Sequence, residues 1–324
     1  MHSFEELLSF FEESLNKENF SGKPEELYAP IKYTLNLGGK RIRPVLTLMA
    51  CEMFGGEINT ALPQAIAIEL FHNFTLIHDD IMDNAPIRRG KPSVYKKWSS
   101  NIAILSGDTL FAYAYQYAQK ADSRLLGDIL SVFNQTAIEV CEGQQYDLNF
   151  ETRNDVRVEE YIEMIRLKTA VLFGASLKIG SLIGGAPHLE ANKLYNFAIN
   201  IGLGFQLKDD LLDTYGDESV FGKKTGGDIL SNKKTFLYLK SLELANKEDK
   251  ERLITLYNSS DYDDVKKINE VKSIFSKLNI DKITEQEIDL YFKAGVVDLE
   301  SLNVSYTIKP ELYNLAYNMI HRDR

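Results

Sequence analysis

Two acidic clusters have residue types and a spacing that suit catalysis. The first comprises Asp79, Asp80 and Asp83, at the end of an apolar run with helical spacing. At about 100° per residue, Asp79 and Asp83 lie one turn apart on the same helix face, where two carboxylates repel each other unless a cation lies between them. A single cluster of this kind is most often a solvated helix face.

The second cluster repeats the pattern at Asp209, Asp210 and Asp213, again after an apolar run. Basic, glycine-containing segments follow both clusters, and this repetition argues against two solvated faces. Two such acidic faces can meet across a cavity only if several divalent metals lie between them. Oxygen-only ligands suit Mg²⁺, which keeps waters and shares its shell with substrate phosphates, so the pair predicts a magnesium site for a phosphate-bearing substrate.

Cations suited to such a substrate gather before a predicted helix that runs to about residue 54. Gly38 and Gly39 precede Lys40, Arg41 and Arg43 there. Glycines let the backbone approach an anion, and the helix N-terminus and the cations can then bind it. Three cations within four residues favour an oxyanion site over a plain helix cap.

A lysine and a threonine inside a predicted helix over about residues 158–182 leave two interpretations open. Lys168 and Thr169 lie among small and apolar residues, so the lysine either extends its charge to solvent or binds a ligand. Polar residues late in a predicted helix over about residues 126–148 suggest the wall of a water-filled cavity. They are Glu139, Glu142, Gln144, Gln145 and Asp147.

Every strongly patterned segment has helical length and 3.6-residue spacing, which predicts an all-α bundle around a central cavity. We expect a single domain over residues 1–324, with its softest connector at residues 149–156. The net charge of −10 argues against nucleic acid as a partner. The acidic N-terminal segment and the lack of a long apolar run predict no signal peptide and no membrane span, hence a cytoplasmic protein.

These motifs, in this order, resemble those of the trans-isoprenyl diphosphate synthases, the polyprenyl synthetases of the farnesyl and geranylgeranyl diphosphate synthase group. The resemblance runs from about residue 38 to residue 235 and includes Gly222 to Thr235. It implies the type I isoprenoid synthase helical bundle, a homodimer, and Mg²⁺-dependent head-to-tail condensation of an allylic diphosphate with isopentenyl diphosphate.

The resemblance also implies roles for individual residues. Asp79, Asp83 and Asp209 would be the main ligands of three Mg²⁺ ions, and Asp80, Asp210 and Asp213 would support metal-bound water or geometry. The allylic diphosphate would be held by Arg88, Lys168, Lys223 and Lys233, with Thr169 and Gln206 beside its carbon chain. The isopentenyl diphosphate would be held by Gly39, Lys40, Arg43, His72 and Arg89.

In the resembled family, product length depends on the positions four and five residues before the first aspartate. Here they are Thr75 and Phe74, with Phe71 one turn further down. Ideal helix angles place Phe74 off the metal face, so it can close the product tunnel only if the helix bends or the tunnel runs along its side. One aromatic at this pair predicts a C15 or C20 product, and the smaller Thr75 favours C20, geranylgeranyl diphosphate.

The acidic clusters also separate this chain from neighbouring enzyme types. The usual bacterial farnesyl and geranylgeranyl enzymes have four residues between the acidic positions, and this chain has no such insertion between Asp79 and Asp83. The product lengths of those enzymes are therefore a weak guide to the product of this chain.

Other functions share part of the pattern. A terpene cyclase would not need Lys40 and Arg43 for a second diphosphate, and a head-to-head synthase would lack the Gly-Gly-Lys-Arg segment. A metal phosphohydrolase would need more histidine ligands than a chain with five histidines offers, and a non-catalytic partner subunit would have lost one acidic cluster. Metal-dependent diphosphate release, with and without isopentenyl diphosphate, separates these alternatives.

Overall fold

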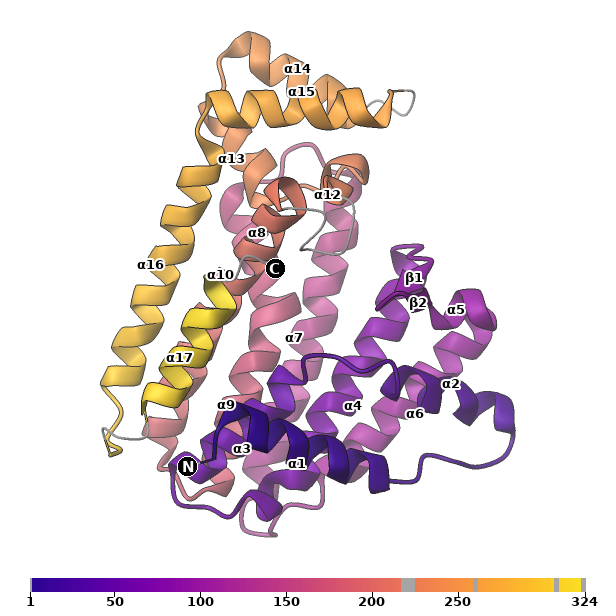
Figure 1. Ribbon diagram of the computed structural model, residues 1–324, viewed down its shortest axis with the longest axis vertical. Coiled ribbons are helices and arrows are strands. Elements are labelled where there is room, and N and C mark those ends of the chain that lie inside the picture. Colours follow the sequence, from indigo (N-terminus) through magenta and orange to yellow (C-terminus); the bar gives the residue numbers. More distant parts are fainter. Residues whose placement is uncertain (1, 217–224, 259–261, 306–308, 322–324) are drawn as a thin grey trace. The chain divides into compact units, whose positions relative to one another are not determined.

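The computed structural model describes residues 2–216, 225–258, 262–305 and 309–321, and most of this part of the chain is helical. The predicted all-α fold is confirmed. In chain order the elements in Figure 1 are α1 (Phe4–Lys17), α2 (Glu25–Leu35), α3 (Ile42–Met53), α4 (Ile58–Met82), β1 (Ile87–Arg88), β2 (Lys91–Pro92), α5 (Val94–Lys97), α6 (Ser100–Ala118), α7 (Leu126–Thr152), α8 (Val158–Ile165), a π-helical turn (Arg166–Ala170), α9 (Val171–Ile183), α10 (His188–Tyr215), α12 (Gly227–Leu230), α13 (Phe236–Leu244), α14 (Lys247–Asn258), α15 (Asp264–Lys277), α16 (Ile280–Glu300) and α17 (Lys309–Ile320).

The chain divides into two compact units. The first comprises Met1–Gln135, Ala175–Leu194 and Asn303–Glu311, and the second comprises Thr136–Gly174, Tyr195–Leu302 and Leu312–Arg324. The connector expected at residues 149–156 lies inside the second unit, and α7 continues through its first half to Thr152. A single functional domain over residues 1–324 stays a prediction.

The central helix of the first unit is α4, because its sequence is apolar on nearly every side. Ile66, Ile68 and Leu70 are at most 1% exposed, as expected for a helix without a polar face. It packs against α3 and α6, and Figure 1 shows α6 running beside it. The acidic cluster therefore lies at the end of a helix that the core holds in place.

A short hairpin follows α4. Its strands pair Ile87 with Pro92 and Arg88 with Lys91. The two turn residues, Arg89 and Gly90, have φ values of 51° and 72°, the left-handed pair that a type I′ hairpin turn requires. The sequence did not predict this hairpin, since two-residue strands are too short to show an alternating pattern.

A π-helical turn interrupts the long helix that was predicted over residues 158–182. It lies against Gly143 of α7, where a Cβ atom would be only 2.3 Å from the backbone nitrogen of Lys168. No side chain tolerates so short a distance, so glycine permits this contact. Inserted π-turns frequently lie at functional sites, and this one carries Lys168 and Thr169.

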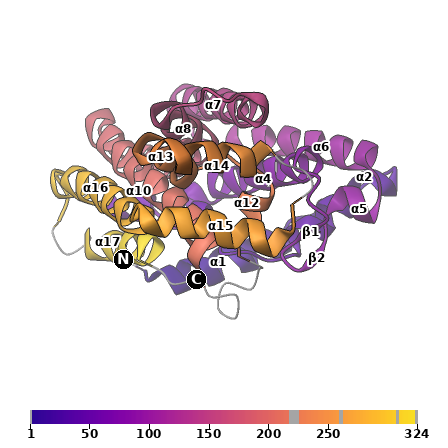
Figure 2. The same cartoon turned by 90° about the horizontal axis from the view of Figure 1, so that it is seen from above.

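In the second unit, α13, α14 and α15 pack together (Figure 2). Lys267 of α15 is buried, and its Nζ donates a hydrogen bond to Asn232 Oδ1 at 2.5 Å. This bond ties α15 to the segment that precedes α13.

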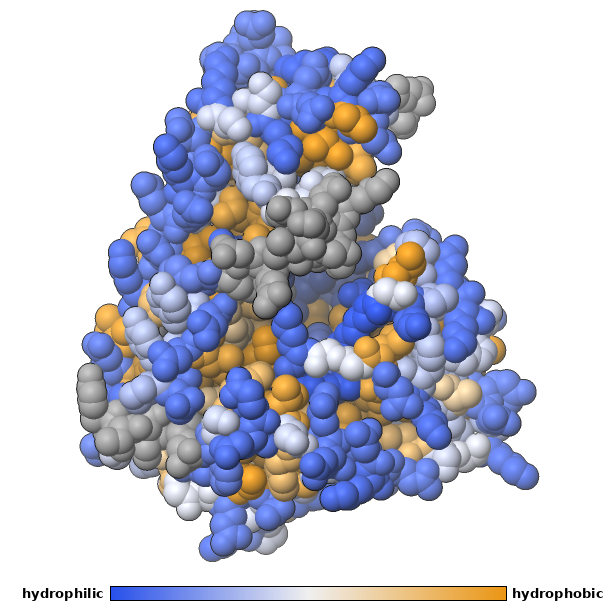
Figure 3. Space-filling view, in the orientation of Figure 1, coloured by the Kyte–Doolittle hydropathy of each residue, from blue (hydrophilic) through white to orange (hydrophobic). Residues whose placement is uncertain are grey.

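The outer surfaces of α15 and α16 are mostly hydrophilic on the face shown in Figure 3. Within the described ranges, no helix is both long enough and apolar enough to cross a membrane.

Candidate active site

The carboxylates of the first acidic cluster have different surroundings at the end of α4. Asp83 caps the helix and is exposed, and its backbone nitrogen donates to the carbonyl of Asp79 at 2.8 Å, which keeps the two aspartates one turn apart. Asp80 is buried, and its Oδ1 accepts hydrogen bonds from Arg88 Nε at 3.0 Å and Nη2 at 2.6 Å. Burial raises the pKa of Asp80, although Arg88 opposes this shift. Asp80 thus fixes the hairpin to α4.

The glycine-rich loop before α3 brings together residues predicted to bind isopentenyl diphosphate. Gly38 and Gly39 have φ values of 75° and 143°, which favour glycine. The Arg89 guanidinium lies over Gly39, where a Cβ atom would be 2.7 Å from Arg89 Cζ, and Arg89 Nη1 donates to the Gly38 carbonyl. Lys40 is exposed on the same loop, as an anion-binding role requires.

His72 of α4 lies beside this loop. Its Nε2 is 3.4 Å from Arg43 Nη1. Burial, followed by the charges of Arg43 and Arg89, lowers the pKa of His72 well below its ordinary value. The imidazole is therefore neutral at neutral pH, and its Nε2 can accept a hydrogen bond from Arg43.

The residues predicted to set product length lie on two sides of α4. The Phe74 ring stacks on Phe111 of α6, with centroids 4.9 Å apart, and also contacts Phe71 at 5.6 Å. Thr75 Oγ1 donates to the carbonyl of His72 at 2.8 Å. Phe74 therefore faces α6 and belongs to an aromatic cluster whose α6 member, Phe111, was not predicted from the sequence.

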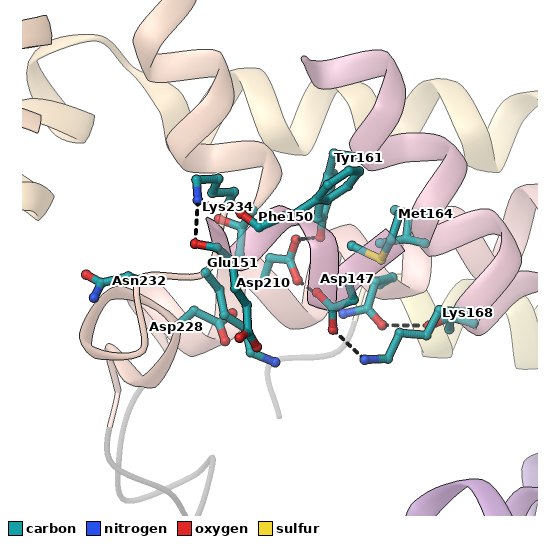
Figure 4. A pocket seen from close by; sticks show the side chains of 15 residues that line it. Asp147, Phe150, Glu151, Tyr161, Met164, Lys168, Asp210, Asp228, Asn232 and Lys234 are labelled. Atoms are coloured by element: carbon teal, nitrogen blue, oxygen red, sulfur yellow. Dashed lines mark hydrogen bonds and ion pairs between the residues drawn. The ribbon is translucent and has the colours of Figure 1, made fainter. Parts of the chain in front are cut away.

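The second unit contains a pocket between α7, the π-turn, α10 and the segment before α13 (Figure 4). Most of the polar residues predicted for the allylic substrate line it. The polar lining includes Asp147, Lys168, Thr169, Gln206, Asp210, Asp228 and Lys233.

A chain of hydrogen bonds runs through this pocket. Thr169 Oγ1 donates to Gln206 Oε1 at 3.1 Å, and Gln206 Nε2 donates to Asp210 Oδ1 at 3.1 Å. The hydroxyl of Tyr161 donates to the other oxygen of Asp210. Because Asp210 accepts a hydrogen bond from the Gln206 amide nitrogen, the amide oxygen of Gln206 is oriented toward Thr169. Tyr161 was missed, because nothing in the sequence around it indicates a contact with Asp210, which lies 49 residues further along the chain.

The ammonium of Lys168 faces a carboxylate in the pocket. Its Nζ lies 2.5 Å from Asp147 Oδ2, and both side chains are 21% exposed. Lys234, which the sequence analysis did not single out, donates to the carbonyls of Phe150 at 2.5 Å and Glu151 at 3.1 Å near the C-terminal end of α7. Figure 4 shows the side chains of Lys168, Asp147 and Lys234 in this pocket.

Crowded carboxylates make this pocket suitable for a cation. Burial and then the charge of Asp213 raise the pKa of Asp228 to about 7, and the backbone nitrogen of Asp228 donates to Asp213 Oδ2 at 2.9 Å. Burial and then Asp228 raise the pKa of Asp210 well above its ordinary value. A hard cation with oxygen ligands would relieve this repulsion. Asp228 was missed because it lies in a glycine- and lysine-rich segment.

In the part of the chain that the structure describes, no three histidine, cysteine, aspartate or glutamate side chains converge as a closed metal site. The aspartates present fit an ion that completes its coordination shell with water or substrate oxygens, as Mg²⁺ commonly does. Asp209 and Asp213 are partly buried on α10. Lys223, one of the predicted diphosphate ligands, lies outside the described residues.

An all-α fold with two aspartate clusters and two groups of cationic residues indicates the class of prenyl synthases, and comparison with known proteins agrees. The polyprenyl synthetase family model matches residues 24–275. A geranylgeranyl diphosphate synthase from Methanosarcina mazei is 44% identical over 229 residues, which cover 70% of this chain and 71% of that protein. One from Sulfolobus acidocaldarius is 37% identical over 324 residues, covering 97% of this chain and 91% of that protein.

A solved structure gives the same result. The crystal structure of a geranylgeranyl pyrophosphate synthase is 43% identical and superposes with a TM-score of 0.94, covering 99% of both chains. This chain therefore belongs to the polyprenyl synthetase family and is a prenyltransferase.

Proposed function

We propose that this prenyltransferase condenses isopentenyl diphosphate with an allylic diphosphate, releases diphosphate, and makes geranylgeranyl diphosphate as its main product. The observation that carries the proposal is a cationic loop in the first unit, in addition to the pocket around Lys168 in the second unit. In that loop Arg89 donates to the Gly38 carbonyl, and Arg43 lies 3.4 Å from His72. A terpene cyclase, which binds one diphosphate, has no use for such a loop. The names of the relatives support the C20 product.

We assign the metal-binding role to aspartates of both clusters. Asp79, Asp83 and Asp209 are the main ligands of Mg²⁺, with three ions expected when substrate is bound, and Asp213 supports them. Arg88 already engages Oδ1 of Asp80, and Gln206 and Tyr161 engage the two oxygens of Asp210, which suits a supporting role. Bound Mg²⁺ neutralises negative charge on the departing diphosphate.

The protein's own residues then act on the two substrates. Arg88, Lys168, Lys223 and Lys233 bind the allylic diphosphate, and Lys40, Arg43 and Arg89 bind the isopentenyl diphosphate. The allylic C–O bond breaks with its electron pair on the departing diphosphate. The resulting cation lies beside the Gln206 carbonyl and the Thr169 hydroxyl, whose oriented dipoles stabilise it without trapping it. The isopentenyl double bond attacks, a C–C bond forms, and the released diphosphate takes the proton that is lost.

We further propose a cytoplasmic homodimer in which residues 1–324 work as one domain. The family resemblance supports the dimer, and α6 offers an apolar surface that a second copy could cover: Ile104 is 42% exposed and Leu105 is 58% exposed. Light scattering of the purified protein measures this directly, and a monomeric mass would contradict the dimer.

Product analysis by mass spectrometry tests the proposed reaction. Purified enzyme with Mg²⁺ and isopentenyl diphosphate should convert dimethylallyl, geranyl and farnesyl diphosphate to the C20 product. Phe74→Ala removes the ring that stacks on Phe111, so it should shift products to C25 or longer with unchanged metal dependence. Absence of any condensation product would refute the function. An unchanged product from the variant would refute only the role of Phe74.

A further inference from the structure

Arg41 lies between two predicted substrate ligands, Lys40 and Arg43, but its environment differs from theirs. Its side chain is 3% exposed, and that of its partner Glu69 is 2% exposed. Lys40, the preceding residue in the chain, is exposed. Arg41 is therefore buried as half of an ion pair and unavailable to a diphosphate in solvent.

The guanidinium of Arg41 joins three helices of the first unit. Its Nη1 donates to Glu69 Oε1 in the middle of α4, and its Nη2 donates at 2.6 Å to the carbonyl of Leu35, the last residue of α2. Arg41 is itself the N-cap of α3, with a φ of 47°. One planar side chain thus connects the end of α2, the start of α3 and the core helix α4.

The same contacts fix the position of the loop along α4. Glu69 lies one turn before His72, which is the neighbour of Arg43. Asn73 Nδ2 donates to Glu69 Oε1 at 2.8 Å and so fixes the carboxylate that Arg41 meets. Arg41 and Arg43 therefore contact successive turns of one buried helix, which places the loop backbone between them.

Stability alone is a poor explanation for this arrangement. Burying two charges has a desolvation cost that an apolar pair of similar volume avoids. Arg41 adopts a left-handed conformation that is unfavourable for a residue with a side chain. Its Nε and Asn73 Oδ1 are also buried without a hydrogen-bond partner among the described residues. An ion pair with directed hydrogen bonds can do what an apolar pair cannot, namely fix the position of a loop.

We propose that the Arg41–Glu69 pair positions the loop that binds isopentenyl diphosphate, so that Lys40 and Arg43 are held in place before the substrate arrives. The inference rests on the function proposed for that loop. Cations that are already ordered lose less conformational entropy when an anion binds. Arg41 and Glu69 are positioning residues, because neither contacts the substrate.

Steady-state kinetics of Arg41→Lys and Glu69→Gln test the proposal. A lysine keeps the charge but cannot donate to both Glu69 and Leu35 through a planar fork. Glu69→Gln keeps the shape of the side chain but leaves the Arg41 charge buried without a counter-charge. Each variant should raise the KM for isopentenyl diphosphate about tenfold while the KM for the allylic diphosphate stays within about twofold.

Two further variants separate positioning from folding. Arg41→Met combined with Glu69→Leu removes both buried charges, so it should fold with a melting temperature near that of the wild type and still show the raised KM. Arg124→Lys is the matched control, because Arg124 is exposed in the same unit and pairs with Asp122. It should leave both KM values unchanged.

An equal rise in both KM values, or a double variant with the wild-type KM for isopentenyl diphosphate, would overturn the positioning role. Failure of the proposed function would look different, since the wild-type enzyme itself would then show no saturable dependence on isopentenyl diphosphate.

Discussion

At the scale of single residues, His72 shows how surroundings decide the charge of a side chain. The sequence placed it near a predicted anion site, where a protonated imidazole would be useful. The structure instead partly buries it next to Arg43, and its surroundings lower its pKa, so that the ring acts as a neutral neighbour of the cations. The positive charge available for substrate is then that of the arginines and lysines.

His72→Gln tests this charge state through the pH dependence of stability. In the unfolded chain the imidazole binds a proton near its ordinary pKa of 6.5, whereas the folded state binds it only at lower pH. The wild type therefore loses unfolding free energy as pH falls below that value, by up to about 1.4 kcal/mol per pH unit. Glutamine does not titrate, so urea unfolding should show a smaller loss for the variant. Parallel curves for the two proteins would mean that the pKa of His72 is the same in the folded and unfolded states, which would contradict its neutral charge state.

At the scale of elements, the π-turn and α7 together place the pocket residues. The wide turn brings Lys168 toward α7, and Gly143 leaves room for the backbone of Lys168. Asp147 lies one turn further along α7, and its Oδ2 is 2.5 Å from the ammonium nitrogen of Lys168. A side chain at position 143 would separate these elements.

Gly143→Ala should therefore displace the π-turn. We expect a loss of about 1–3 kcal/mol of unfolding free energy. Relative to the wild type, the KM for the allylic diphosphate should rise more than the KM for isopentenyl diphosphate. Gly127→Ala is the matched control on the same helix, because a Cβ atom there meets nothing within 4 Å. It should leave activity unchanged and stability equal or slightly higher. Equal effects of the two substitutions would show that close packing at Gly143 has no special role.

The length of the apolar segments was sufficient to predict the long helices, because α4, α6 and α10 are long segments rich in apolar residues. It could not predict the π-turn or the hairpin after α4, since both depend on a few residues and on contacts with distant segments. The same limit applies to the site. The aspartates of both clusters stand out in the sequence, whereas Tyr161 and Asp228 become visible only when folding brings them to Asp210 and Asp213.

At the scale of the whole molecule, residues of both units have roles in the proposed chemistry. The first contains the aspartates of α4 and the cationic loop, and the second contains the aspartates of α10 and the pocket around Lys168. The proposed condensation needs both sets, because the loop is assigned to one diphosphate and the pocket to the other. An enzyme that only removed or cyclised an allylic diphosphate would turn over without isopentenyl diphosphate.

Diphosphate release from farnesyl diphosphate, measured with and without isopentenyl diphosphate, tests this claim most directly. The wild type with Mg²⁺ should release one diphosphate for each C20 product and almost none without isopentenyl diphosphate. Asp79→Ala and Asp209→Ala should each lower the rate by at least about a hundredfold, whereas Asp289→Ala, at a half-exposed position of α16, should have no effect. Equal release without isopentenyl diphosphate, or near-full activity of either cluster variant at limiting Mg²⁺, would contradict the account.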